Sequence, residues 1–274
     1  MDHLIQIEFV GDRSDPIMEA YTTLAALGVA TSKIRLGVLC TCSFFRNPAL
    51  LAKMGATIDQ ISKGRFWLGL GAGWYGEEAK RYGYTFSRDS RRLEMLEEAL
   101  QIVKKAWTEE NPTFRGKHYS IENFALNPKP LQRPRPPILV GGGGEKVTLR
   151  LVAKYADACN LFPKGDELRR KLEALRTHCK AVRRDYSSIL KTKLASVMFG
   201  RDQSDALRKI DKYRPPWLDL EGYSSSFLLG SPKEIAKQVE ELADIGIEYL
   251  IVNFRGKYDP LDKKTFSKEV MSRF

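Results

Sequence analysis

The stretch PILVGGGGEKVTLR, residues 137–150, places a buried strand directly before four glycines and an amphipathic helix. An apolar run that ends in glycine brings bare backbone N–H groups close to whatever lies beyond the strand. The N-terminus of the following helix adds a partial positive charge, which favours a phosphate. One glycine would suit a tight strand-to-helix turn without a ligand, but four in succession favour an anion site.

The composition is that of an ordinary soluble globular protein. The chain has 274 residues, of which 43% are hydrophobic and 29% charged, and this length is ample for one large domain. No apolar stretch approaches the length of a membrane span, and the start MDHL does not resemble a signal peptide. We therefore expect a cytoplasmic protein without membrane contact.

The formal net charge of +11 has three interpretations. A nucleic-acid surface is disfavoured, because Lys and Arg are dispersed over helices and no aromatic-interleaved basic run is present. A scattered basic surface and the attraction of an anionic small molecule both remain open. The cysteines Cys40, Cys42, Cys159 and Cys179 show no metal-ligand spacing, so we expect no metal site.

Strand and helix patterns alternate along the chain. Near-continuous apolar runs, typical of parallel strands covered on both faces, occur at 34–42, 66–71, 137–140, 158–162, 194–199 and 248–254. Helices are expected at 15–31, 47–62, 91–107, 166–186, 204–213 and 231–245, three of them opening on a capping residue followed by Pro. A hairpin and loop excursion at about 112–136 interrupts this rhythm without a domain boundary. We expect one α/β domain over residues 1–274.

Repeated βα units fit either a barrel or an open doubly wound sheet. Several strands, rather than one, run into glycine or polar residues: TCSFFRNP at 41–48, GLGAGWYGEE at 69–78, and the four glycines. This favours a barrel whose C-terminal rim carries the site.

These strand ends resemble the luciferase-like monooxygenase family of flavin- and deazaflavin-dependent enzymes, and most of all its branch of oxidoreductases that use coenzyme F420. The resemblance is carried by residues 2–4, 19–24, 46–53, 69–78 and, above all, 141–160. It implies a (β/α)8 TIM barrel of the bacterial-luciferase type, with an isoalloxazine-like ring at the C-terminal rim.

The resemblance also implies roles for individual residues. It implies proton transfer by His3, and cofactor contacts by Asp2, Cys42, Ser43, Gly71, Ala72, Gly73, Gly141, Gly142, Gly143, Gly144 and Glu145. In particular, Cys42 and Ser43 match a strand bulge at which deazaflavin-dependent members often have a non-prolyl cis peptide, and the glycine run matches the loop that holds the ribityl phosphate.

Residue types alone offer plainer interpretations of the same positions. Asp2 would cap a turn, Cys42 would be a small buried hydrophobe, and Glu77 and Glu78 would be partners of a helix dipole. Two further histidines, His118 and His178, would lie on the surface. The aromatic residues Trp74, Tyr75 and Tyr84 would either line a substrate cleft or pack.

The family normally has a strand, a helix and a second strand before the Asp-His pair, whereas here that pair follows Met1. We therefore expect either a start assigned to an internal methionine or a barrel that is N-terminally incomplete, without its first strand, first helix and most of its second strand. An open barrel exposes strand edges that invite pairing with another chain. We accordingly expect a homo-oligomer, and a dimer before other states.

The expected function is hydride transfer between coenzyme F420 and a small organic substrate. One alternative is an FMN-dependent monooxygenase of the same family. An alternative of another class is a non-catalytic flavin-binding protein or an inactive, truncated homologue.

Overall fold

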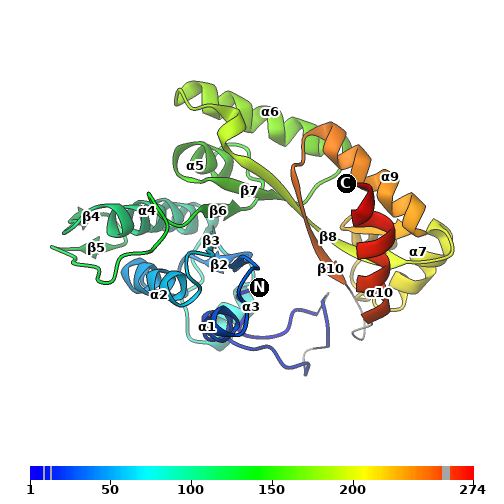
Figure 1. Cartoon of the computed structure of the whole chain (residues 1–274), viewed down its shortest axis with the longest axis horizontal. Helices are drawn as coiled ribbons and strands as arrows, with labels where there is room; N and C mark the ends of the chain where they lie inside the picture. Colours follow the sequence, from blue (N-terminus) through cyan, green and yellow to red (C-terminus); the bar gives the residue numbers. More distant parts are fainter. Residues whose placement is uncertain (9, 13, 255–259) are drawn as a thin grey trace. The chain divides into compact units, whose positions relative to one another are not determined.

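The computed structural model describes residues 1–8, 10–12, 14–254 and 260–274, and it divides into two compact units (Figure 1). The first unit comprises Met1–Ile5, Pro16–Cys159 and Thr177–Ile189. The second comprises Gln6–Asp15, Asn160–Arg176 and Leu190–Phe274. Strand β7 (Ala158–Leu161) lies where the chain passes from one unit to the other.

The first unit is built on a short parallel sheet. Strand β3 (Phe66–Gly71) pairs with β1 (Leu36–Gly37), β2 (Thr41–Cys42) and β6 (Ile138–Gly141). The side chains of Phe66, Leu68 and Leu70 are completely buried, and Trp67 on the opposite face of β3 is partly buried. The expected parallel strands, covered on both faces, are thus confirmed for this part of the chain.

Helices cover this sheet, and their bounds are α1 (Ala20–Ala30), α2 (Pro48–Ile61), α3 (Gly76–Arg81), α4 (Asp89–Thr108) and α5 (Thr148–Tyr155). The predicted start of α2 is confirmed, because the Asn47 side chain accepts a hydrogen bond from the Ala49 N–H. Helices α2 and α4 pack closely, and the Trp107 Nε1–H donates to the Ala52 carbonyl oxygen at 2.9 Å.

One extra residue separates β1 from β2. Gly37 pairs with Trp67 and Thr41 with Leu70, so residues 38–40 lie opposite residues 68–69. Such an insertion is a β-bulge. The partner strand accommodates it at Gly69, where a Cβ would lie only 1.9 Å from the Val38 carbonyl oxygen.

The expected position of the bulge was wrong. The non-prolyl cis peptide joins Leu39 to Cys40, whereas Cys42 pairs in regular register with Gly71. The bulge therefore precedes the position at Cys42 and Ser43 that the resemblance implied, because the register of β3 admits the extra residue beside Gly69 rather than beside Gly71.

The predicted excursion at 112–136 contains a hairpin, β4 (Phe114–Arg115) with β5 (Ser120–Ile121). The proline-rich segment that follows has cis bonds at Asn127–Pro128 and Arg133–Pro134. The carboxylate of Asp59, which is fully buried in α2, accepts the backbone N–H groups of Leu131 and Gln132 and so anchors this segment.

The second unit is also parallel, with β8 (Leu190–Phe199) pairing with both β9 (Phe227–Gly230) and β10 (Tyr249–Phe254). Its helices are α6 (Gly165–Ala181), whose last turn belongs to the first unit, α7 (Gln203–Asp211), α8 (Leu220–Ser224), α9 (Pro232–Ile245) and α10 (Pro260–Thr265). Short helical turns lie at Tyr186–Ser188, Phe266–Val270 and Met271–Arg273. The predicted capping box of α9 is confirmed, since Ser231 and Glu234 bond reciprocally.

Strand β8 begins four residues earlier than predicted, at Leu190 instead of 194. Two lysines obscured its start. Lys191 is paired with Glu248 at 2.9 Å, and the fully buried Lys193 donates to the carbonyl oxygens of Phe162 and Pro163. A charged residue in a strand therefore escaped a prediction based on apolar runs.

Helix α1 starts at Ala20 instead of residue 15. Its capping side chain is Glu19, whereas the Asp15 carboxylate accepts the Asp12 N–H within the preceding turn. The Asp15–Pro16 pair therefore ends a loop and does not begin the helix.

Replacing Gly69 by Ala should destabilise the protein, because the new Cβ would clash with the Val38 carbonyl oxygen and the bulge would have to move. Overpacking of this kind costs about 1–3 kcal/mol, which thermal unfolding measures as a lower midpoint. The matched control is Gly71→Ala on the same strand, where a Cβ would meet nothing closer than 3.6 Å. Equal midpoints for G69A and G71A would contradict this account of the bulge.

Candidate active site at the strand ends of the first unit

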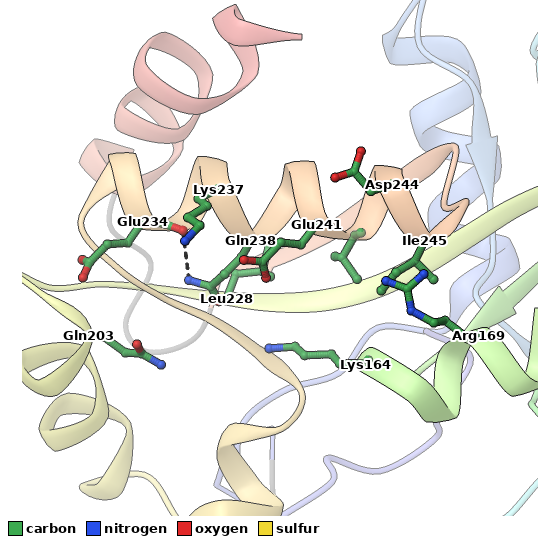
Figure 2. Close-up of a pocket in the computed structure, with 12 residues that line it drawn as sticks. Lys164, Arg169, Gln203, Leu228, Glu234, Lys237, Gln238, Glu241, Asp244 and Ile245 are labelled. Carbon is green, nitrogen blue, oxygen red and sulfur yellow. Dashed lines mark hydrogen bonds between the residues drawn. The ribbon is translucent and has the colours of Figure 1, made fainter.

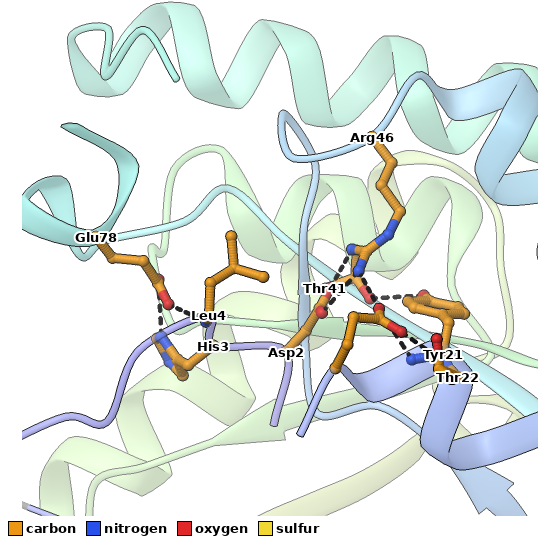
Figure 3. A network of polar contacts seen from close by, with 9 residues as sticks. Asp2, His3, Leu4, Tyr21, Thr22, Thr41, Arg46 and Glu78 are labelled. Atoms are coloured by element: carbon orange, nitrogen blue, oxygen red, sulfur yellow. Dashed lines mark hydrogen bonds and ion pairs between the residues drawn. The ribbon is translucent and has the colours of Figure 1, made fainter. Parts of the chain in front are cut away.

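His3 is held by a buried glutamate (Figure 3). Its Nδ1 lies 2.9 Å from an Oε of Glu78, a residue of the first turn of α3 that is 1% exposed. The same carboxylate accepts the backbone N–H groups of Leu4 and Ile5. With Nδ1–H donated to a carboxylate, Nε2 is the ring nitrogen left to exchange a proton. Glu78 thus fixes both the N-terminal segment and the orientation of His3.

Two aromatic rings flank the imidazole. The Trp74 and Tyr75 rings stack with centroids 5.1 Å apart, and they meet His3 edge-on at 5.8 and 6.2 Å. Trp74 is 55% exposed, so this pair lies at an open edge of the first unit. Of the two interpretations open for these aromatics, packing against His3 is present and contact with a substrate stays a prediction.

Asp2 is engaged by the protein itself. Arg46 binds its carboxylate through both terminal nitrogens, at 2.6 and 3.1 Å, and also reaches Glu19 at 2.5 Å (Figure 3). Beneath the guanidinium lies the Tyr21 ring, whose hydroxyl is 2.6 Å from the Thr41 hydroxyl. Burial raises the pKa of Asp2, and Arg46 opposes that shift. The carboxylate therefore locks residue 2 to the start of α2, and its role as a cofactor contact stays a prediction.

Ser43 offers a buried hydroxyl. Its backbone N–H donates to the Gly71 carbonyl oxygen at 2.9 Å, and its own carbonyl accepts the Tyr119 hydroxyl at 3.1 Å. The residue is 1% exposed, and its Oγ has no hydrogen-bond partner in the part of the chain that the structure describes. Because a buried hydroxyl without a partner is costly, this atom is suited to a ligand.

The neighbouring cysteines are not activated nucleophiles. Burial raises the pKa of Cys40 and of Cys42 to about 12. Since the thiolate is the reactive form, both thiols are inert near neutral pH. The interpretation of Cys42 as a small buried hydrophobe fits this environment.

The four glycines divide into two roles. A Cβ at Gly141 would lie 2.4 Å from the Cys40 sulfur, so the first glycine gives room to the Cys40 side chain beside the bulge. Gly142 has φ +119°, a conformation that glycine adopts readily. Helix α5 begins only at Thr148, after a turn over residues 145–147, and no side chain caps it. The contacts of Gly141–Gly144 with a phosphate stay a prediction.

The two further histidines are placed differently from the expectation, and one of them contacts Glu145, whose role at the cofactor stays a prediction. The Glu145 carbonyl oxygen lies 2.7 Å from His178 Nε2, which ties the glycine loop to α6. The His118 side chain is only 5% exposed and contacts Glu94 at 2.8 Å. Neither His178 nor His118 is a plain surface residue, because each closes a contact between segments distant in sequence.

The loop after β3 is shaped by its glycines. Gly73 has φ +76°, and a Cβ there would lie 2.4 Å from the Cys42 sulfur. Its carbonyl accepts a hydrogen bond from the Arg92 guanidinium at 3.3 Å. Between it and Gly71, Ala72 is half-buried.

Strand pairing places the candidate residues at neighbouring strand ends. Cys42 lies opposite Gly71, and the Gly141 carbonyl oxygen is 3.6 Å from where a Cβ of Gly71 would be. Glu78, which follows the β3 loop, holds His3 through its carboxylate. The sequence missed Glu78 as a functional residue, since a first-turn glutamate is commonplace; its signal was its position in the segment GLGAGWYGEE.

A cavity of about 650 Å³ lies elsewhere, in the second unit (Figure 2). Lys164, Arg169, Lys237 and Glu241 are among the residues that line it, and none of the candidate site residues does. Within the described residues, no cluster of three or more His, Cys, Asp or Glu side chains could hold a metal ion. Nor does any described helix combine the length and apolarity that a membrane span requires.

Lowering the pH should weaken the contact between the Glu19 carboxylate and Arg46. Burial raises the pKa of Glu19, but hydrogen bonds from Thr22, Tyr21 and Arg46 outweigh it and lower the pKa from 4.5 to about 2. A group with a lowered folded-state pKa stabilises the fold above its unfolded value and loses that contribution as the pH falls. Wild type should therefore unfold at a higher temperature than Glu19→Gln near neutral pH, and the difference should shrink between pH 4.5 and 2. A difference independent of pH would contradict this assignment.

The chain is similar to known proteins over most of its length. Residues 6–223 match the model of the luciferase-like monooxygenase family. The FMNH(2)-dependent dimethylsulfone monooxygenase of Pseudomonas putida is 28% identical over 92% of this chain and 78% of its own length. The F420-dependent glucose-6-phosphate dehydrogenase of Kineococcus radiotolerans is 31% identical over 81% of this chain and 65% of its own length.

Among solved structures, an F420-dependent secondary alcohol dehydrogenase in complex with an F420-acetone adduct matches with a TM-score of 0.85. It covers 96% of this chain and 86% of the other, at 19% identity, so this likeness shows the fold alone. The predicted fold class is confirmed: the chain is α/β with mostly parallel strands, and its structural neighbours are luciferase-like TIM-barrel enzymes. By the match over residues 6–223, the chain belongs to the luciferase-like monooxygenase family of oxidoreductases.

Proposed function

We propose that the chain transfers a hydride between coenzyme F420 and a small organic substrate. The observation that carries this proposal is the His3–Glu78 pair, a proton-transfer group held at 2.9 Å by a buried carboxylate at the end of the β3 loop. A relative and a structural neighbour that use F420 support the choice of cofactor. The net charge of +11 suits the acidic tail of F420.

The residues at the strand ends fit a flavin-type cofactor. The Ser43 hydroxyl is buried and has no partner among the described residues, so it has a hydrogen bond to offer. Backbone N–H groups of a glycine loop before a helix suit a phosphate. In this proposal Ser43 and Gly71–Gly73 contact the ring, and Gly142–Gly144 with Glu145 hold the phosphate.

When bound, a deazaflavin supplies a two-electron hydride donor or acceptor. The chain's own task is then to place the substrate and to move one proton. His3 does this at Nε2, because Glu78 occupies Nδ1. Reduction of a carbonyl requires a proton at the substrate oxygen, which the doubly protonated His3 donates from Nε2, leaving the neutral ring; in oxidation of the alcohol, Nε2 of the neutral ring accepts the hydroxyl proton. The aromatic pair Trp74 and Tyr75 packs edge-on against the imidazole and restricts its orientation.

The second candidate is an FMN-dependent monooxygenase. It is favoured by the 28% identity to an FMNH(2)-dependent enzyme over 92% of this chain. The same strand ends would hold FMN, whose phosphate and ring offer similar acceptors. The remaining alternative is a non-catalytic flavin-binding protein, which would bind a cofactor without turnover, or an inactive, truncated homologue, which predicts that neither cofactor binds.

Fluorescence titration with F420 and, separately, with FMN distinguishes these candidates. We expect tight binding of F420 and weaker binding of FMN. Ser43→Ala should weaken binding about fivefold, the value of one hydrogen bond, without lowering the unfolding temperature, because the hydroxyl has no protein partner to lose. Tighter binding of FMN would support the monooxygenase instead, and binding of neither would contradict both.

The tautomer of the His3 imidazole can be measured without a substrate. Nitrogen-15 NMR of the imidazole should show the Nδ1–H tautomer in the wild type, because Glu78 accepts that proton. Glu78→Ala should shift the neutral ring towards the Nε2–H form. The matched control is Glu77→Ala, which removes the adjacent carboxylate paired with Arg81. An unchanged tautomer in E78A would sink the proposed role of Glu78.

A further inference from the structure

The turn of the β4–β5 hairpin encloses a carboxylate of the protein itself. Glu98, on α4, accepts the backbone N–H groups of Lys117, His118 and Tyr119 at 2.8, 2.9 and 2.9 Å. Gly116 leaves room for it, since a Cβ there would lie 2.3 Å from a Glu98 oxygen. Consecutive N–H groups that converge on one anion form a strong and directional contact.

A second carboxylate of α4 binds the same hairpin turn. Glu94, one turn earlier on α4, contacts both the Lys117 ammonium and the His118 ring at 2.8 Å. Residues four apart lie on the same face of a helix, so both glutamates meet the hairpin together. A hairpin with strands of two residues is marginal by itself, and α4 therefore sets its position.

Tyr119 of the same hairpin turn contacts the candidate cofactor site. The Tyr119 hydroxyl donates to the Ser43 carbonyl oxygen at 3.1 Å. Burial raises the pKa of Tyr119 to about 12, so the phenol is a donor near neutral pH. The Ser43 N–H is already bound to Gly71 at 2.9 Å. The backbone of Ser43 is thus fixed at both its N–H and its carbonyl, and only its hydroxyl has no partner among the described residues.

We propose that Tyr119 is a positioning residue for the cofactor. Glu98 of α4 holds the hairpin turn in place, and Tyr119 of the same turn holds Ser43. The hydrogen bond to the Ser43 carbonyl holds the loop after β2 so that the Ser43 hydroxyl points at the ligand. This inference rests on the proposed function for its ligand, but the positioning of Ser43 is a property of the protein alone.

The test compares Tyr119→Phe with Tyr155→Phe. Tyr155 is the matched control, because its hydroxyl bonds to Glu97, the neighbour of Glu98, and does not reach Ser43. Two measurements are made on each full-length protein: amide hydrogen exchange over residues 41–45 without cofactor, and the Kd for F420 and for FMN by fluorescence titration. Thermal unfolding is recorded for both variants.

We expect Y119F to exchange faster at residues 41–45 and to bind the preferred cofactor about fivefold more weakly, with an unfolding temperature equal to that of Y155F. Y155F should change neither exchange nor Kd. Glu98→Ala should reproduce both effects of Y119F, and the double variant should add little, because both act on one chain of contacts.

Exchange at residues 41–45 that is unchanged in Y119F, or raised equally in Y155F, would overturn the inference. So would a Y119F protein with faster exchange but an unchanged Kd. If the wild type binds neither F420 nor FMN, the proposed function fails, and the exchange measurement by itself decides whether Tyr119 positions Ser43.

Discussion

The candidate site depends on the close approach of the bulge at residues 38–40 to its neighbouring strands. Gly69 gives room to the Val38 carbonyl, and Gly141 gives room to the Cys40 sulfur. A side chain at position 69 would push the strands apart, and one at position 141 would displace the Cys40 side chain. Because the three strands meet here, the loops that follow them, from Ser43, Gly71 and Gly142, lie together at one edge of the sheet.

This packing constraint changes how the four consecutive glycines are interpreted. A run of four suggested a single phosphate cradle; its first member also gives room to the Cys40 sulfur, and the second has φ +119°, so packing and backbone conformation favour glycine here without a ligand as well. The acidic residues have protein partners that the sequence did not indicate. Asp2 is bound to Arg46, and Glu78, interpreted as a partner of a helix dipole, holds His3.

The sequence predicted the elements that repeat a simple pattern. The buried strand β3, the helix α2 with its Asn47 cap and the capping box of α9 follow from local residue types, which act over a few positions. The position of the bulge, the Glu78 contacts and the contact of the hairpin with Glu98 could not be predicted, because each joins residues distant in sequence. The start of β8 was missed for another reason: buried Lys193 is satisfied by carbonyl groups that only the fold brings near.

The central claim is that a flavin-type cofactor binds at the strand ends of the first unit. Mapping of backbone amide chemical shifts during titration with F420 tests it most directly. The account predicts changes at Ser43, Gly71–Gly73 and Gly142–Gly144, with none around Lys164 and Lys237 in the cavity of the second unit. Changes confined to that cavity, with the strand ends unaffected, would contradict it.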